Sequence, residues 1–151
     1  MKAIIPVAGA GTKLRPHSYT QPKALIPLAG KTILGIIIEQ LQAAGIQDFI
    51  FVVGYLGEKI EDFVQQHYPT LHAHYVHQTD RQGVGQAILL TRDLVQGDDI
   101  FIVLGDTICE YDIKAVMAES RSMIGLRKVE DPRDFGVAEI NDSGFIERLV
   151  E

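Results

Sequence analysis

The sequence lacks the features of disulfide-stabilised, membrane-spanning and general nucleic-acid-binding proteins. One cysteine, Cys109, excludes an intramolecular disulfide framework and fits a reducing compartment. No stretch approaches the roughly 20 apolar residues that a membrane-spanning helix needs. The formal net charge is −6, whereas general nucleic-acid binders usually carry an excess of basic residues. We therefore expect neither a membrane nor a nucleic acid as partner.

Targeting signals, internal repeats and low-complexity tracts are also missing from the sequence. The apolar run at 3–8 is too short for a secretory signal and breaks into glycines and charges. A chain of 151 residues is expected to form one domain that buries about 68–70% of its unfolded surface. The expected location is the cytoplasm.

The order of the apolar segments predicts an α/β fold. Short apolar runs that alternate with helical patterns over the first hundred residues indicate βαβ units, hence a mostly parallel sheet with helices on both faces. Two prolines are expected to hold residues 21–27 extended. Strands are expected at 2–7, 49–53, 71–77, 100–104 and 122–127, helices at 33–44, 58–67, 83–94 and 112–119, and a hairpin at 135–140 and 145–150.

A glycine loop follows the first predicted strand. Gly9 and Gly11 allow backbone N–H groups to approach an anion closely, because no Cβ stands in the way. Lys13 and Arg15 follow and supply positive charge, although they could also be solvated loop charges. A local cationic loop in an acidic protein favours a small anionic ligand.

A second candidate group follows the predicted strand at 100–104. Gly105 and Asp106 stand directly after that strand, as the glycine loop does after the first one. Ligands of parallel sheets bind beyond the carboxyl ends of the strands, so we expect Asp106 to lie near the loop. Asp106 could instead cap the following helix. The apolar strand and the glycine before it favour an acid that faces a ligand.

Familiar nucleotide-binding motifs do not fit the glycine loop. A dinucleotide fingerprint needs a third glycine where Leu14 stands, and a P-loop needs glycine directly before Lys13, where Thr12 stands. The Asp-Phe-Gly triplet at 134–136 matches the metal-binding triplet of protein kinases. No kinase-type glycine-rich loop or His-Arg-Asp loop precedes it, which excludes a kinase.

The histidines and the cysteine do not indicate a zinc or nucleophile site. Of His72, His74 and His77, only the first two share a strand face, and no cysteine joins them. Solvated strand histidines are therefore the favoured interpretation. Cys109 has no histidine neighbour, so we expect a small packed residue.

Several motifs carry a resemblance that covers the whole chain in register. They are Ala-Gly-Ala-Gly-Thr-Lys-Leu-Arg-Pro at 8–16, Pro-Lys-Ala-Leu-Ile-Pro at 22–27, Gly-Ile at 45–46, Gly-Val-Gly-Gln-Ala at 83–87, Leu-Gly-Asp at 104–106 and Phe-Gly-Val at 135–137. Together they resemble the sugar-1-phosphate nucleotidyltransferases, among them glucose-1-phosphate thymidylyl- and uridylyltransferases. The resemblance implies a three-layer Rossmann-like domain with a mostly parallel, mixed sheet.

The resemblance also implies a reaction and its partners. A sugar 1-phosphate oxygen would attack the α-phosphorus of a nucleoside triphosphate, and pyrophosphate would leave. No covalent intermediate is needed, so catalysis would depend on positioning and charge neutralisation. Thymidylyl or uridylyl transfer onto glucose 1-phosphate is the first expectation, with Mg²⁺ as cofactor.

The resemblance assigns phosphate and metal roles residue by residue. Lys13, Lys23 and Asp106 would form the catalytic set, in which the lysines neutralise phosphate oxygens and Asp106 binds Mg²⁺. The segment that would hold the triphosphate consists of Ala8, Gly9, Ala10, Gly11, Thr12 and Lys13.

The base and sugar contacts are implied by the same resemblance. Gln78 and Gly83 fall where the family contacts the base, although a polar residue that leaves a strand needs no ligand to explain it. Gly136 and Glu151 fall where the family contacts the sugar. Both assignments are expectations carried over from matching positions.

The sequence departs from the family pattern in two ways. Lys13 stands where the family usually has arginine, which keeps the charge but loses the planar fork that grips two phosphate oxygens. The sequence also ends at Glu151, before the usual Lys-Pro and a second acidic metal ligand. We therefore expect a nucleotidyltransferase domain truncated at the C-terminus, comprising the nucleotide-binding half and the start of the sugar-binding half.

These departures leave an alternative function open. The chain could be a catalytically weak or inactive module that binds nucleotide and serves regulation. The open edge of the hairpin at 135–150 further predicts weak self-association into a homo-oligomer.

Overall fold

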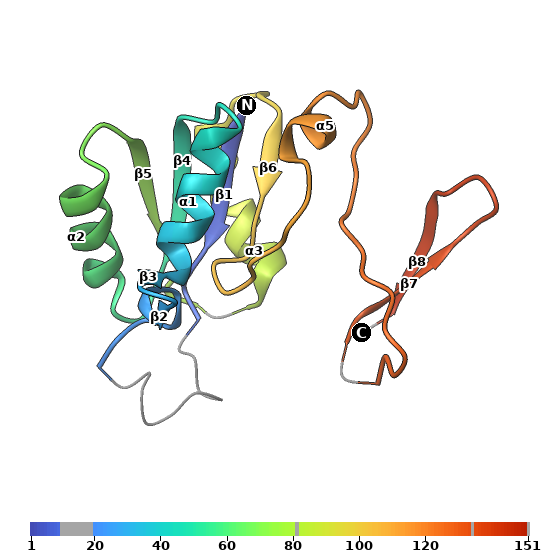
Figure 1. The fold of residues 1–151 in the computed structure, drawn as a ribbon, viewed down its shortest axis with the longest axis horizontal. Coiled ribbons are helices and arrows are strands. Elements are labelled where there is room, and N and C mark those ends of the chain that lie inside the picture. The colour runs from blue at the N-terminus through green and yellow to red at the C-terminus, as the bar shows by residue number, and fades with distance from the viewer. Residues whose placement is uncertain (10–19, 81, 134, 151) are drawn as a thin grey trace. The chain divides into compact units, whose positions relative to one another are not determined.

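The computed structural model describes residues 1–9, 20–80, 82–133 and 135–150. The chain divides into two compact units, Met1–Lys114 and Ala115–Glu151, which are described separately. Figure 1 shows the elements of both units in sequence colours.

A parallel four-stranded sheet forms the centre of the first unit. Its order is β5-β4-β1-β6. Ile4 of β1 pairs with Ile50 of β4 on one side and with Ile102 of β6 on the other. The predicted α/β fold with a parallel sheet is confirmed. The strands are β1 (Lys2–Pro6), β4 (Asp48–Val53), β5 (His72–His77) and β6 (Ile100–Ile102).

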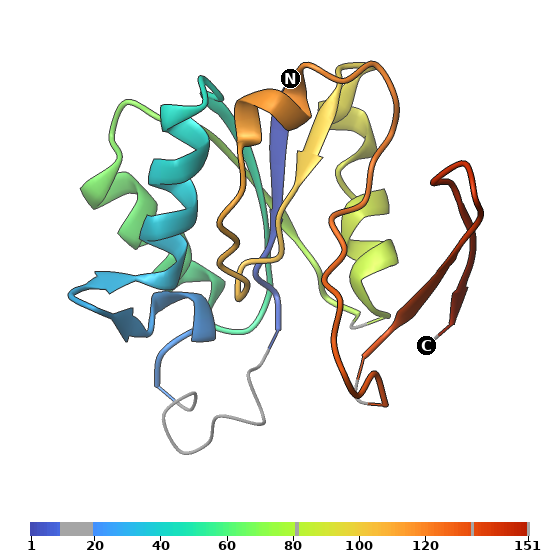
Figure 2. The ribbon, with the colours of Figure 1, turned by 45° about the vertical axis from the view of Figure 1, so that its right-hand side comes forward.

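Helices lie on both faces of this sheet. Figure 2 shows α1 (Ile33–Ala43) on one side and α3 (Val84–Leu89) on the other. On the α3 side, Ile4, Ile50 and Val52 pack with Ala87 in a cluster that excludes water. Burial of such side chains is the main stabilising contribution of the layer. The helix α2 (Gly57–His67) follows β4 in the chain.

The first helix begins and ends at the predicted signals. The Thr32 hydroxyl caps α1 by accepting a hydrogen bond from the Gly35 N–H at 3.0 Å. Gly45 follows the helix with a φ of 101°, a value that favours glycine. A short antiparallel pair, β2 (Pro27–Leu28) and β3 (Lys31–Thr32), leads into the helix, and the cap Thr32 is the last residue of β3.

The predicted helix at 83–94 is instead two helices, α3 and α4 (Arg92–Val95). The break lies at Thr91, which is almost fully buried. Its hydroxyl and its N–H both donate to the carbonyl of Ile88, at 2.7 and 3.0 Å. This i−3 bonding tightens the turn and competes with continuation of the α-helix.

Two sequence expectations in the first unit are corrected. Residues 21–27 are not extended throughout, because Lys23–Leu25 form a 3-10 turn, η3. Apart from fixing its own φ, a proline restricts the residue before it, such as Ile26, which is extended, and not the residues that follow it. Cys109 is exposed rather than packed.

The histidines of β5 are solvated, as predicted. His72, His74 and His77 are all exposed. His72 lies 3.1 Å from an Asp48 carboxylate oxygen, and His77 lies 3.3 Å from one of Glu61. Within the described ranges, no cluster of three or more metal-ligating side chains could hold a metal ion.

The second unit contains a β-hairpin. β7 (Val137–Ile140) pairs antiparallel with β8 (Ile146–Val150), as predicted. The Asn141 side-chain oxygen accepts from the N–H groups of Ser143 and Phe145, and Gly144 has a φ of 82°. Self-association through this hairpin stays a prediction.

The strand predicted at 122–127 is wrong. These residues, all described, form no strand pairing, and Met123, Ile124 and Leu126 are exposed. A short apolar stretch becomes a strand only where a neighbour completes its hydrogen-bond ladder. The short helix α5 (Ile113–Met117) replaces the longer helix expected at 112–119 and lies at the boundary of the two units.

None of the helices seen in the described ranges has the length and apolar character to cross a bilayer.

Candidate functional site

The candidate site begins where β1 and β6 end at the carboxyl edge of the sheet. The ladder continues beyond β6, because the Gly105 N–H donates to the Pro6 carbonyl at 3.1 Å. This bond places Asp106 beside the end of β1, where Ala8 and Gly9 follow. A Cβ on Gly105 would lie 2.2 Å from Cγ1 of Val7, so only glycine permits this approach. The structure thus brings Asp106 to the start of the glycine loop.

The turn η3 carries Lys23 to the same edge. The Lys23 ammonium donates to Oδ2 of Asp106 at 2.7 Å, across 83 positions of sequence. The side chains of Lys23 and Asp106 keep 36% and 44% of their surface exposed, so the pair remains open to a ligand. Two contacts hold the segment before and within the turn: Gln21 donates to the Leu25 carbonyl, and Lys59 of α2 donates to that of Thr20.

The Asp106 carboxyl is held in its ionised form. Partial burial of Asp106 acts to raise its pKa, but the hydrogen bond and charge of Lys23 oppose this effect. A hydrogen bond from the Thr107 hydroxyl to Oδ1, at 3.2 Å, and a backbone hydrogen bond also lower the pKa. The net result is a pKa below the ordinary value of an aspartic acid. Asp106 therefore carries a negative charge at neutral pH.

This carboxylate fits a magnesium ion that is shared with a substrate. Mg²⁺ commonly takes one or two carboxylates and completes its shell with phosphate oxygens and water. The ionised carboxylate of Asp106 supplies oxygen atoms, the kind of ligand that Mg²⁺ binds. Across the described part of the chain, no group of three acidic, histidine or cysteine side chains completes a site by itself.

Gln78 and Gly83 are brought together at the end of β5. The Gln78 side chain is buried, and its amide nitrogen donates to the Gly83 carbonyl at 3.1 Å. The same nitrogen donates to the side-chain oxygen of Gln86 at 2.5 Å. Gly83 has a φ of 91°, which suits glycine, and precedes α3. The Gln78 side chain thus joins the loop before α3 to the helix itself.

Sequence reasoning missed the contribution of Gln86. Its position in the Gly-Val-Gly-Gln-Ala motif was a signal, but motif matching alone gives no partner for its side chain. The structure shows that Gln86 accepts from Gln78, so the two side chains fix one another.

The other predicted site residues are only partly described. Ala10, Gly11, Thr12 and Lys13 lie outside the described residues, as does Glu151. Gly136 belongs to the second unit and directly precedes β7. Their predicted roles therefore stay predictions.

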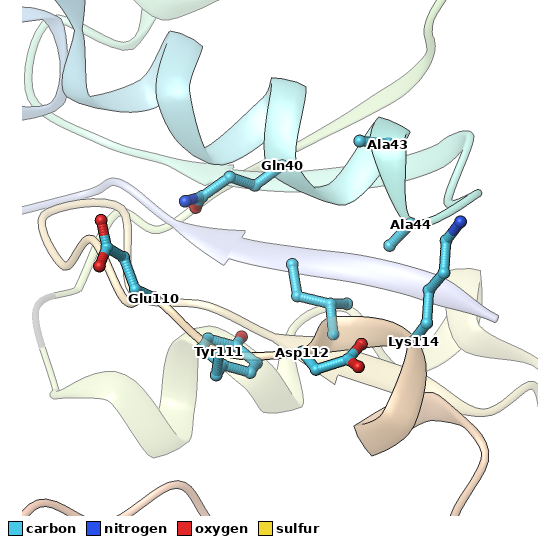
Figure 3. Close-up of a pocket in the computed structure, with 8 residues that line it drawn as sticks. Gln40, Ala43, Ala44, Glu110, Tyr111, Asp112 and Lys114 are labelled. Carbon is cyan, nitrogen blue, oxygen red and sulfur yellow. The ribbon is translucent and has the colours of Figure 1, made fainter.

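A separate pocket of about 410 Å³ lies in the first unit. Figure 3 shows side chains from the C-terminal half of α1 facing those of residues 110–114. Its charged residues are of both signs, and Lys23 and Asp106 do not line it, so we place the candidate site at the ion pair instead. The lining residues are Gln40, Ala43, Ala44, Glu110, Tyr111, Asp112, Ile113 and Lys114.

Comparison with known proteins places the chain in a family. The family model for "Nucleotidyl transferase" matches residues 2–151. The chain is 37% identical over 152 residues to the bifunctional protein GlmU of Methanococcus vannielii, covering 100% of the chain and 35% of that protein. It is 35% identical over 157 residues to a glucose-1-phosphate thymidylyltransferase of Streptomyces griseus, covering 100% of the chain and 44% of that protein. The chain therefore spans less than half the length of these relatives.

A solved structure has the same fold. It is a Bacillus anthracis protein in complex with a sucrose, described as a glucose-1-phosphate thymidylyltransferase. The TM-score is 0.86 at 28% identity, and the match covers 100% of this chain and 64% of that one. The predicted Rossmann-like fold is thus confirmed. Because the family model spans nearly all of the sequence and the fold agrees, the resemblance to sugar-1-phosphate nucleotidyltransferases is confirmed, and the chain belongs to the nucleotidyl transferase family.

Proposed function

We propose that the carboxyl edge of the sheet binds a nucleoside triphosphate and takes part in transferring its nucleotidyl group to a sugar 1-phosphate. The observation that carries this proposal is the Lys23–Asp106 pair beside the end of β1. It places a cation for phosphate oxygens and an anion for a metal ion next to Ala8 and Gly9, where the glycine loop begins. A nucleoside triphosphate bound to a divalent metal needs both charges.

Each residue has a defined task in the proposed reaction. Lys23 neutralises an oxygen of the α-phosphate as negative charge develops there in the transition state. Asp106 holds Mg²⁺, which would neutralise charge on the phosphates when bound. The loop from Ala8 to Lys13 binds the triphosphate, and Gln78 and Gly83 border the base. These groups position the sugar phosphate oxygen in line with the leaving pyrophosphate, with no covalent intermediate.

We further propose glucose 1-phosphate as the acceptor and dTTP or UTP as the donor. Relatives from Streptomyces griseus and Bacillus anthracis described as glucose-1-phosphate thymidylyltransferases support this choice. Gly136 and Glu151 are the proposed sugar contacts. The proposed location is the cytoplasm.

A second candidate function is nucleotide binding without turnover. The observation behind it is that the described residues contain no group of three or more acidic, histidine or cysteine side chains that could hold a metal ion. In that case the chain would retain a nucleotide and release no pyrophosphate.

The experiment measures binding and turnover separately. Calorimetry with dTTP, UTP and GTP, each with and without Mg²⁺, tests binding. Pyrophosphate release with glucose 1-phosphate or mannose 1-phosphate, together with chromatography of the nucleotide-sugar product, tests catalysis. Product formation supports the transferase, and binding without product supports the second candidate. Absence of binding by all three nucleotides contradicts both.

A further inference from the structure

The ion pair at the candidate site has a second consequence, because both Asp106 oxygens are already engaged. Oδ2 accepts from the Lys23 ammonium at 2.7 Å, and Oδ1 accepts from the Thr107 hydroxyl at 3.2 Å. The proposed metal position and the ammonium position therefore use the same carboxylate. A metal ion at Oδ2 would lie beside the Lys23 ammonium, so the two cations would repel each other.

We propose that Lys23 is an internal counterion of Asp106, which the triphosphate draws away so that the metal ion binds this carboxylate more tightly with the nucleotide than alone. This inference rests on the proposed function. It makes Lys23 the residue that couples metal entry to nucleotide binding. A divalent cation alone would meet a carboxylate whose charge is already balanced.

The exposure of the pair makes such an exchange feasible. More than a third of each side chain is open to solvent, and an exposed ion pair changes an equilibrium by at most about fivefold. Such a contact biases the carboxylate against a metal ion without locking it. A triphosphate carries more negative charge than one carboxylate, so it competes successfully for the ammonium. The dication then replaces the monocation at Asp106.

The position of Lys23 suits this exchange. The backbone turn Lys23–Leu25 is fixed by hydrogen bonds, because the Leu25 N–H donates to the Pro22 carbonyl and the Ile26 N–H donates to the Lys23 carbonyl. Only the flexible side chain has to move. Lysine is a point charge on a flexible stem, so it can turn from a carboxylate to a phosphate oxygen at small cost.

The test measures metal and nucleotide affinities independently. Binding of Mn²⁺ alone is followed by electron paramagnetic resonance at low salt, where screening is weak. Binding of dTTP in the presence of a chelator is followed by calorimetry. The variants are Lys23→Met, Lys23→Arg, Asp106→Asn and the Lys23→Met/Asp106→Asn double variant. Lys128→Met, at an exposed position in the second unit, gives the same change in net charge.

The proposal predicts effects of opposite sign for Lys23→Met. Mn²⁺ should bind about fivefold more tightly than to the wild-type protein, because the competing ammonium is gone. Metal-free dTTP should bind about tenfold more weakly, because a charged hydrogen bond to phosphate is lost. Lys23→Arg should leave the Mn²⁺ affinity near the wild-type value. The Lys23→Met/Asp106→Asn double variant should not show the tighter Mn²⁺ binding expected for Lys23→Met. Lys128→Met should change neither affinity appreciably.

The results that overturn the proposal are distinct from failure of the proposed function. No gain in Mn²⁺ affinity for Lys23→Met, or a gain that persists without the Asp106 carboxylate, overturns the exchange. If Lys23→Met binds both Mn²⁺ and dTTP more weakly than the wild-type protein, the variant has a structural defect, and this result also overturns the proposal. If wild-type protein binds no nucleotide at all, the proposed function fails, whereas the Mn²⁺ series still reports on the competition at Asp106.

Discussion

Gly105 sets the distance between β1 and the segment that carries Asp106, so its replacement tests the geometry of the site. In a Gly105→Ala variant, the new Cβ would lie 2.2 Å from Cγ1 of Val7 and 3.0 Å from the Pro6 carbonyl oxygen. The first distance is far below van der Waals contact. The Val7 side chain is β-branched and buried, so it cannot rotate away freely. The strand ends must separate.

The expected cost follows from measured overpacking. Forcing one methyl group into a packed core typically destabilises a protein by about 1–3 kcal/mol. Because a backbone oxygen is also contacted, we expect about 2–3 kcal/mol for Gly105→Ala. For a chain of this size, that loss corresponds to a fall in Tm of about 4–12 °C. The shift of Asp106 should also weaken nucleotide binding.

The assay is thermal unfolding followed by circular dichroism, together with calorimetry for the nucleotide. Gly85→Ala is the matched control, because a Cβ on Gly85, within α3, meets no atom within 4 Å. That variant should be neutral or more stable, since alanine is the better helix former. Val7→Ala in the Gly105→Ala background should recover part of the loss. An unchanged Tm for Gly105→Ala, or strict additivity of the two substitutions, would refute the steric reasoning.

Three further predictions concern the helices and the acid. Thr32→Ala should cost about 1 kcal/mol by removing the cap on the Gly35 N–H, whereas Thr32→Ser should retain it, as urea unfolding can measure. Thr91→Val should cost about 1 kcal/mol in the same assay, because the hydroxyl bond to Ile88 is lost while the volume is kept; no change would show that the bond contributes nothing. Asp106 has a lowered pKa, so its stabilising contribution is present above its ordinary unfolded pKa near 4 and is lost as pH falls through the lower folded value. The difference in unfolding free energy between wild type and Asp106→Asn should therefore shrink with acidification, and a difference that does not vary with pH would contradict the ion pair.

The two central strands of the sheet, β1 and β4, could be predicted because they are buried on both faces. Ile4 and Ile50 belong to continuous apolar runs, and that pattern has few alternative explanations. The start of α1 could also be predicted, because the Thr32 cap is a local signal. The resulting topology was sufficient to place Asp106 near Ala8 and Gly9, since both follow parallel strands. Local sequence patterns therefore predicted that two segments far apart in the sequence lie close together.

The remaining features depend on contacts that a sequence pattern does not contain. The end of α3 follows from the bond between buried Thr91 and Ile88, although threonine by itself does not end a helix. The strand predicted at 122–127 failed because a short apolar stretch does not by itself provide a neighbouring strand. Cys109 is exposed because packing of a small residue requires a surrounding core, which the local sequence cannot guarantee.

The turn at Lys23 links these two kinds of information. Its prolines are visible in the sequence, yet they restrict Gln21 and Ile26 and leave the residues between them free to turn. A fully extended segment would carry the chain about 3.3 Å per residue past the sheet edge. The 3-10 turn is more compact than an extended segment, and in it the Lys23 ammonium lies 2.7 Å from Asp106. The charge at the proposed phosphate site therefore depends on a local backbone choice that tertiary contacts decide, and substitutions of Gln21, whose side chain closes the turn on Leu25, should alter nucleotide affinity without any contact to the ligand.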